Sequence, residues 1–181
     1  MPAYAYVVLA LGWIVWMAPF ILLRSSGEKA PKVDRSARWG ILLVAAAYSL
    51  LWQGRFWERP LPFWRLVLSV VFLALASLLS WTAARALGRH WRMDAALDPD
   101  HQLVTSGPYR LVRHPIYTSM LCLVLGTGLM ITPPLLLASS VVVFILGTDI
   151  RVRAEEKLLA SRFGDQFGEY QRAVPAYFPF F

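Results

Sequence analysis

Two short segments in the second half of the chain hold most of the residues that are able to carry out polar chemistry. The first contains Arg113-His114-Pro115 immediately before an apolar run. Proline suits the first turn of a helix, so Arg113 and His114 should stand at a helix N-terminus, where free N–H groups and the helix dipole favour a carboxylate or phosphate. The alternative is that both side chains anchor the helix to lipid headgroups. The residues alone give these two interpretations equal weight.

The second segment follows the last apolar run and carries two adjacent carboxylates. Glu155 and Glu156 lie within two turns of that run and close to Arg151 and Arg153. A carboxylate buried there needs a cation or a hydroxyl as its partner, although most charges on such a helix are solvated. Apolar side chains recur in this tail at helical spacing and predict an amphipathic helix on the membrane surface: Leu159, Phe163 and Tyr170.

Other signals favour structural roles. Gly126-Thr127-Gly128 lies inside an apolar run with no strand before it, which indicates close helix packing and not a dinucleotide-binding loop. His90 and His101 lack cysteine or glutamate at ligand spacing, so no metal site is expected. The single cysteine, Cys122, excludes a disulfide framework and is expected to be a packed, inert thiol.

The composition indicates a membrane protein. The 181 residues are 57% hydrophobic and 16% charged, whereas roughly a quarter of the residues in soluble domains are charged. The net charge of +7 comes from basic clusters separated by apolar runs and not from one basic stripe, which argues against nucleic acid as a partner.

Five apolar runs are expected to cross the membrane as helices. The first has no basic residue before it, so it lacks the form of a cleaved signal peptide and should remain in the protein. The last two are separated only by Thr132-Pro133-Pro134, which predicts a tight helical hairpin. The expected spans are residues 4–23, 39–54, 63–87, 116–131 and 135–148.

Lysines and arginines set the expected orientation of these spans. Fifteen of the 18 fall on one side, and only Arg55, Arg59 and Arg65 fall on the other. The positive-inside rule therefore places the N-terminus outside and the C-terminal tail in the cytoplasm. Both chemistry-bearing segments then lie on the cytoplasmic side.

The same segments resemble a known enzyme family. The residues that carry the resemblance are Gly107-Pro108-Tyr109-Arg110, Arg113-His114-Pro115-Ile116-Tyr117, Glu155-Glu156, Phe163-Gly164, Tyr170 and Val174-Pro175. This pattern resembles the isoprenylcysteine carboxyl methyltransferases and their bacterial relatives over roughly the C-terminal half. One departure is Ser119, which stands where the family commonly has a glycine that permits close backbone approach.

The resemblance implies S-adenosylmethionine as the cofactor. It carries over His114, Pro115, Tyr117 and Glu156 as cofactor-site positions. The chemistry of the cofactor adds three expectations. The helix start at Arg113 and His114 would hold its carboxylate, Tyr109 or Tyr117 would face its sulfonium, and Glu156 would accept hydrogen bonds from the ribose or the ammonium.

The predicted architecture is an all-α integral membrane protein forming one domain over residues 1–181. About five spans would carry a cytoplasmic loop and a C-terminal amphipathic helix, with the cofactor half at about 88–181. In-line methyl transfer from an activated sulfonium needs alignment and exclusion of water but no metal. A carboxylate acceptor would also need no general base, and Arg110 or Arg153 would orient it.

The predicted function is methyl transfer at the cytoplasmic membrane face to a lipophilic small molecule or lipidated substrate, with membrane lipids as surroundings. The acceptor is expected to be an isoprenylcysteine-type carboxylate, with an amine or a thiol as alternatives. The competing hypotheses are a sterol-reductase-like enzyme that uses NADPH and a non-catalytic transporter or channel subunit. An arginine- and alanine-rich composition indicates a bacterial inner-membrane protein. The sequence predicts no oligomeric state.

Overall fold

The computed structural model describes residues 1–23, 37–53, 60–88 and 103–177, and these residues form helices and connecting turns without a strand. The predicted all-helical class is confirmed. The elements in chain order are α1 (Ala3–Leu22), α2 (Ala37–Leu51), α3 (Phe63–Leu87), the 3-10 turn η3 (Gly107–Arg110), α4 (Pro115–Ile131), α5 (Pro134–Phe163) and α6 (Asp165–Ala173).

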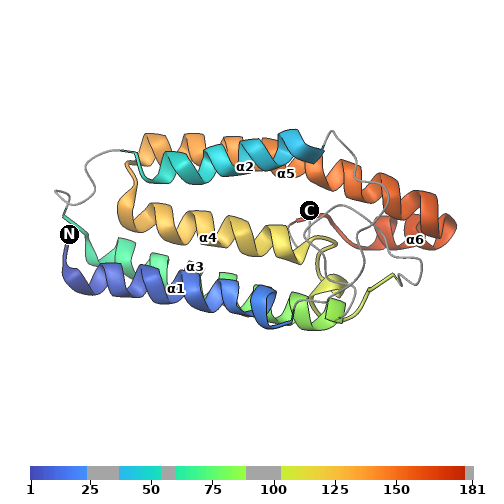
Figure 1. Cartoon of the computed structure of the whole chain (residues 1–181), viewed down its shortest axis with the longest axis horizontal. Coiled ribbons are helices and arrows are strands. Elements are labelled where there is room, and N and C mark those ends of the chain that lie inside the picture. The colour runs from blue at the N-terminus through green and yellow to red at the C-terminus, as the bar shows by residue number, and fades with distance from the viewer. Residues whose placement is uncertain (24–36, 54–59, 89–102, 178–181) are drawn as a thin grey trace.

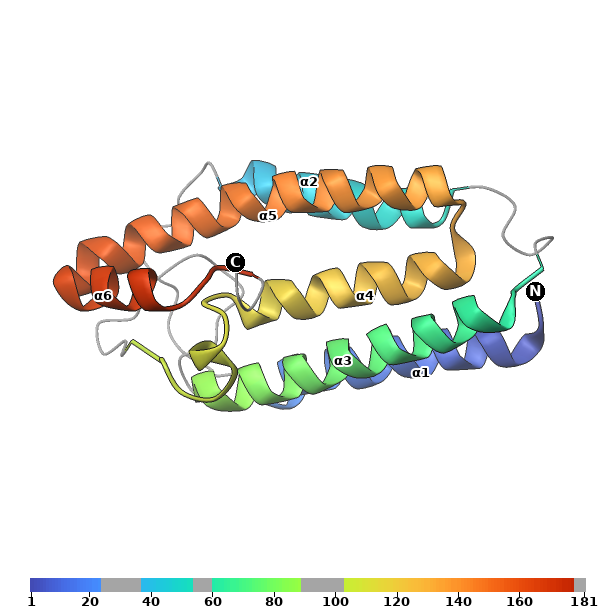
Figure 2. The same ribbon diagram turned by 180° about the vertical axis from the view of Figure 1, so that it is seen from behind.

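Helix α4 lies at the centre of the bundle. It runs between the pair formed by α1 and α3 and the pair formed by α2 and α5 (Figures 1 and 2). Most of its side chains are buried, and these include Tyr117 at one end and Ile131 at the other. The surrounding helices instead expose many large apolar side chains, such as Ile14, Leu78 and Leu146. Apolar surface on the outside of a bundle is typical of contact with lipid.

Three helices, α1, α3 and α5, are long and apolar enough to cross a membrane. Helices α2 and α4 are apolar but shorter, at 15 and 17 residues. The protein is therefore an integral membrane protein, and five crossings remain a prediction. The helices agree with the predicted apolar runs within a few residues at most ends, and α3 has the predicted bounds.

The last apolar run differs from the prediction, because the helix does not end at residue 148. Helix α5 continues without a break for 30 residues, to Phe163. The charged stretch after Thr148 is rich in alanine, leucine, arginine, glutamate and lysine, which are strong helix formers. The helix ends at Gly164, whose φ of 50° suits glycine, and α6 begins at the next residue. Glu155 and Glu156 therefore stand on the extension of a membrane helix.

Close backbone contacts and buried hydrogen bonds fix the helices to one another. The expectation of close packing at Gly126-Thr127-Gly128 is confirmed, because a Cβ atom at Gly126 would lie 3.1 Å from the Leu73 backbone nitrogen of α3. Ser119 is buried in α4, where its hydroxyl accepts a hydrogen bond of 3.1 Å from the Trp16 indole of α1. The residue that departs from the family pattern thus ties α1 to α4, one turn below the helix start.

The α4–α5 hairpin is stabilised from a neighbouring helix. The Arg65 guanidinium donates to the backbone oxygens of Gly128, at 3.3 Å, and Thr132, at 2.7 Å. A cation at a helix C-terminus satisfies free carbonyls and complements the helix dipole. The guanidinium of Arg65 therefore lies on the C-terminal end of α4.

Candidate functional site

Helix α4 begins where the sequence predicts, with His114 as the residue before its first turn and Pro115 as the first helical residue. The chain leads into α4 through the η3 turn, in which Gly107 has a φ of 60° and Tyr109 is buried. The backbone N–H groups of Arg113 and His114 are not free, because they donate to the backbone oxygens of Pro175 and Ala176 at 2.8 and 3.0 Å. The segment that follows α6, residues 174–177, therefore lies directly against the start of α4; we call it the closing segment.

Glu156 is the meeting point of three side chains. Its Oε1 accepts from Arg113 Nε at 2.8 Å and from His114 Nε2 at 3.1 Å, and its Oε2 accepts from Gln171 Nε2 at 3.0 Å. Arg113, His114 and Glu156 are only 11%, 7% and 15% exposed. Burial favours the neutral carboxyl, but the hydrogen bonds from His114 and Arg113 outweigh it and hold the pKa of Glu156 below its ordinary value.

Glu155 forms a second carboxylate centre beside the first. The Tyr117 hydroxyl donates to Glu155 Oε1 and accepts from Arg151 Nε at 2.7 Å. A second Arg151 nitrogen lies 3.6 Å from Glu155 Oε1, and His114 Nδ1 lies 3.7 Å from Glu155 Oε2. The His114 ring thus faces both carboxylates, one with each nitrogen, and links the two centres. We call the set Arg113, His114, Tyr117, Arg151, Glu155 and Glu156 the carboxylate cluster.

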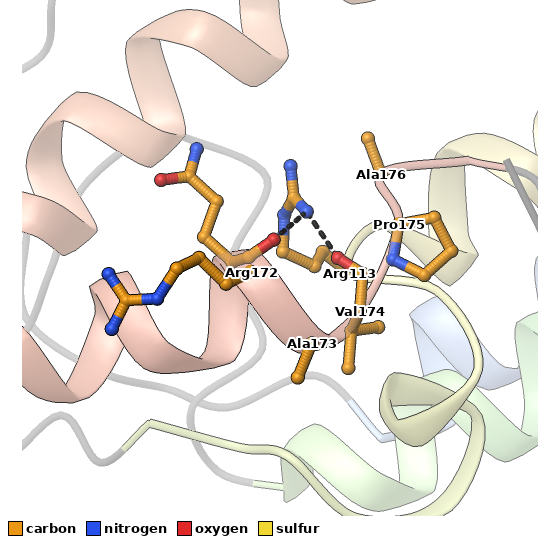
Figure 3. Close-up of a pocket in the computed structure, with 7 residues that line it drawn as sticks. Arg113, Arg172, Ala173, Val174, Pro175 and Ala176 are labelled. Carbon is orange, nitrogen blue, oxygen red and sulfur yellow. Dashed lines mark hydrogen bonds between the residues drawn. The ribbon is translucent and has the colours of Figure 1, made fainter.

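The C-terminal segment closes over one side of this cluster. Arg113 donates to the backbone oxygen of Gln171, at 3.0 Å, and to that of Val174 (Figure 3). The Tyr170 hydroxyl donates to the Tyr109 oxygen at 2.6 Å, which joins α6 to the η3 turn. Together these contacts bind the tail to the segment that precedes α4.

An open pocket of about 480 Å³ lies on this closing segment. Figure 3 shows the Arg113 guanidinium among the carbonyl oxygens of the segment, while the side chain of Arg172 extends away from it. The lining residues are Arg113, Gln171, Arg172, Ala173, Val174, Pro175 and Ala176.

Tyr177 brings one more polar group to the cluster. Its ring lies 6.3 Å from the His114 ring, and its backbone oxygen accepts from the Thr118 hydroxyl at 3.0 Å. Burial raises the pKa of Tyr177 to about 12, so its hydroxyl remains a donor at neutral pH. That hydroxyl is buried close to Thr148, and it has no hydrogen-bond partner among the described residues. A buried donor of this kind is available to a ligand.

Most of the predicted site residues come together. Arg113, His114, Tyr117 and Glu156 belong to the carboxylate cluster, Pro115 starts the helix that carries it, and Tyr109 is buried beneath α6.

The two predicted acceptor-orienting arginines lie outside the cluster. Arg110 is exposed on the η3 turn. Arg153 is 79% exposed and pairs with Asp149 at 2.7 Å. Successive helical residues are rotated by about 100°, so Arg153 points away from the face that carries Arg151 and Glu155.

Arg151 was missed as a site residue, although a signal for it is present in the sequence. Arg151 and Glu155 are four residues apart, the spacing that places two side chains on one helix face. Gln171 and Tyr177 were also missed, and no local pattern indicates them because they reach the cluster only through the fold of the tail. Residues 89–102 of the predicted cytoplasmic loop, which include His90 and His101, lie outside the described residues.

The sequence of the chain is similar to those of known methyltransferases. Residues 64–166 match the phospholipid methyltransferase family. The chain belongs to that family. The matched range contains the whole carboxylate cluster and omits α1, α2 and the closing C-terminal segment.

Individual relatives confirm the resemblance to isoprenylcysteine methyltransferases. Protein-S-isoprenylcysteine O-methyltransferase B of Arabidopsis thaliana is 33% identical over 61% of this chain and 57% of its own length. A protein-S-isoprenylcysteine O-methyltransferase of Schizosaccharomyces pombe is 27% identical over 95% of this chain and 70% of its own length. The cobalt-zinc-cadmium resistance protein CzcN of Cupriavidus metallidurans is 35% identical over 78% of this chain and 62% of its own length. The chain thus spans about three fifths of the length of several relatives that it matches.

Proposed function

We propose that this protein transfers a methyl group from S-adenosylmethionine to a lipophilic acceptor at the cytoplasmic face of a membrane. The observation that carries the proposal is the carboxylate cluster, which lies within the family-matched residues where the start of α4 meets the part of α5 that extends beyond its apolar run. Neither helix supplies the cluster alone, because α4 contributes the histidine and tyrosine and α5 contributes both glutamates.

The residues present suit S-adenosylmethionine. Its ammonium and ribose hydroxyls require acceptors, and the side chains of Glu155 and Glu156 are 25% and 15% exposed. The unpartnered Tyr177 hydroxyl offers a donor beside them. The aromatic face of Tyr109 or Tyr117 would suit a sulfonium cation, and the Arg151 guanidinium already lies over the Tyr117 ring, 5.8 Å from its centroid.

Arg113 is better suited to organising the site than to holding the cofactor's carboxylate, which was its predicted role. Its guanidinium already donates to Glu156 and to two backbone oxygens of the tail. Arg113 therefore fixes Glu156 and the closing segment relative to each other. We retain the predicted cofactor contacts of His114, Tyr117 and Glu156.

The cofactor supplies a methyl group on a sulfonium that is already activated for displacement. The protein residues need to bind and align the two reactants and to exclude water. Alignment and exclusion of water lower the barrier of a reaction between two molecules. For a carboxylate acceptor we propose Arg151 as the orienting cation, because it is 11% exposed and lies within the cluster. Arg110 and Arg153, the predicted candidates, are the comparison in any test of this role.

Binding and transfer assays on the purified protein test the function. We expect binding of S-adenosylhomocysteine and no binding of NADPH. Transfer of isotopically labelled methyl groups is then measured with an S-farnesylated cysteine, a carboxylate acceptor, and with phosphatidylethanolamine vesicles, an amine acceptor. Binding of NADPH alone would support a reductase, and binding of neither compound would support a non-catalytic membrane subunit.

We also propose the predicted topology, with five crossings, an external N-terminus and a cytoplasmic C-terminus in a bacterial inner membrane. The support is the distribution of basic residues, because 15 of 18 fall on the side that carries the cluster. A reporter protein that works only in the cytoplasm should be active when it is fused at Phe181. If a reporter that works only outside the cytoplasm is active at this position, the orientation is rejected.

A further inference from the structure

We propose that Gly40 of α2 is a positioning residue that sets the place of Arg151 in the carboxylate cluster. This inference rests on the proposed function for its catalytic meaning but not for its geometry. It assigns a role in the site to a helix that lies outside the family-matched residues 64–166.

The first step is the contact between α2 and α5. A Cβ atom at Gly40 would lie 2.6 Å from the Gly147 backbone oxygen, and a Cβ atom at Gly147 would lie 2.9 Å from the Gly40 backbone oxygen. Both distances are too short for real Cβ atoms. The two glycines therefore let the helix backbones touch, as small residues do at helix interfaces in membranes.

The second step leads from this contact to Arg151. Arg151 lies one turn beyond Gly147 on α5, and its Cγ atom is 2.6 Å from the Cβ position of Gly40. The aliphatic stem of Arg151 thus passes through space that any side chain at residue 40 would occupy. The guanidinium at the other end bonds the Tyr117 hydroxyl and lies 3.6 Å from Glu155.

The consequence is that the arginine is held from both ends of its side chain. The bare α2 backbone supports the stem, and the cluster receives the guanidinium. A methyl group at residue 40 would collide both with the Arg151 stem and with the Gly147 backbone oxygen, and the side-chain stem can shift more easily than the backbone. The guanidinium is then displaced from Tyr117 and Glu155. A displacement of about 1 Å in an alignment-dependent reaction reduces the rate by up to about a hundredfold.

The test measures the accessibility of Arg151 separately from activity. Gly40→Ala is compared with Gly126→Ala, which also crowds a helix backbone but in the α3–α4 interface. Each protein is treated with phenylglyoxal, and modification of Arg151 is quantified by mass spectrometry. Arg151 should be protected in the unmodified chain and in Gly126→Ala, and modified several times faster in Gly40→Ala. Unchanged reactivity of Arg151 in folded Gly40→Ala would overturn the proposal.

Activity gives the second readout, through a double-substitution cycle. Gly40→Ala should lower kcat about tenfold to a hundredfold in the unmodified chain but cause little further loss in an Arg151→Ala background. Equal losses in both backgrounds would show a purely structural effect and reject the positioning role. If the unmodified chain transfers no methyl group, the proposed function fails while the phenylglyoxal result still decides the role of Gly40.

Failure of Gly40→Ala to fold is also informative. The double variant Gly40→Ala/Arg151→Ala loses the contact with the Arg151 Cγ atom but keeps the 2.6 Å contact with the Gly147 backbone oxygen, so it should yield more folded protein than Gly40→Ala does. If it does not, the Gly147 backbone and not Arg151 determines the need for glycine, and the proposal is wrong.

Discussion

Replacement of Glu156 by glutamine changes one charge at the point where four side-chain nitrogen atoms converge. Arg113 contributes two of them, and His114 and Gln171 contribute one each. Glutamine keeps the shape and one acceptor oxygen but cannot neutralise Arg113, which is 11% exposed. The substitution therefore tests the charge of the cluster with little change in packing.

The expected loss of stability follows from these contacts. A hydrogen bond to a charged group contributes about 1.5–3 kcal/mol, and breaking a fully buried pair costs about 3–5 kcal/mol. Glu156 is 15% exposed and glutamine retains part of the bonding, so we expect a loss of about 2–3 kcal/mol. For a chain of this size that corresponds to a decrease in Tm of roughly 4–12 °C. Binding of S-adenosylhomocysteine should weaken about ten- to a hundredfold.

Thermal unfolding in detergent, followed by tryptophan fluorescence, measures the first effect, and titration calorimetry measures the second. The matched control is Glu169→Gln, which makes the same chemical change at an exposed position of α6. It should leave both quantities close to those of the unmodified chain. If Glu156→Gln behaves like this control in both assays, Glu156 is not the centre of the cluster and our reasoning from its contacts is refuted.

Three further predictions concern the same region. His114→Ala should weaken S-adenosylhomocysteine binding about ten- to a hundredfold without unfolding the protein, since it removes contacts to both carboxylates; an unchanged affinity would return His114 to a structural role. Deletion from Ser161 onward removes α6 and the closing segment. The remaining protein should still insert into membranes but should no longer bind the cofactor. A folded truncated protein that keeps the native affinity would place the site elsewhere. Because the folded-state pKa of Glu156 lies below its ordinary value of 4.5, its stabilising contribution is complete above about pH 4.5 and is lost as the pH falls through the lower, folded-state value. The Tm measured between pH 7 and pH 3 should therefore fall less steeply at the acid end in Glu156→Gln than in the unmodified chain, and parallel curves would contradict this assignment.

The sequence predicts the helices well where a single physical signal determines them. The apolar run at 63–87 has the same bounds as α3, because Pro62 before it and Gly88 after it limit both the apolar run and the helix. At residue 148 these two boundaries separate. The apolar run ends there, but the residues that follow favour a helix, so α5 continues to Phe163. Hydropathy locates the apolar segment, whereas helix propensity and Gly164 determine where the helix stops.

The candidate site was predictable to a similar extent. His114 and Glu156 were expected in one pocket because they follow different apolar runs on the same side of the membrane, and the structure bonds them directly. The choice between Arg151 and Arg153 depends on how α5 is rotated about its axis. That rotation is set by contacts such as the one between Gly40 and Gly147, more than 100 positions apart in the chain. The local spacing places Arg151 on the same helix face as Glu155, but it does not show which face of α5 turns towards α4.

The continuity of α5 has a consequence for the membrane in which the protein resides. Thirty helical residues extend about 45 Å, whereas the hydrocarbon layer is about 30 Å thick. Glu155 and Glu156 therefore lie on the same continuous helix as the apolar residues that contact lipid. Their distance from the bilayer depends on how much of α5 lies within the hydrocarbon layer. A thicker bilayer draws the carboxylates towards the headgroups, and a thinner one raises them into the aqueous phase unless the helix tilts. Under the proposed function, lipid chain length would therefore adjust the distance between the water-soluble cofactor and an acceptor dissolved in the membrane.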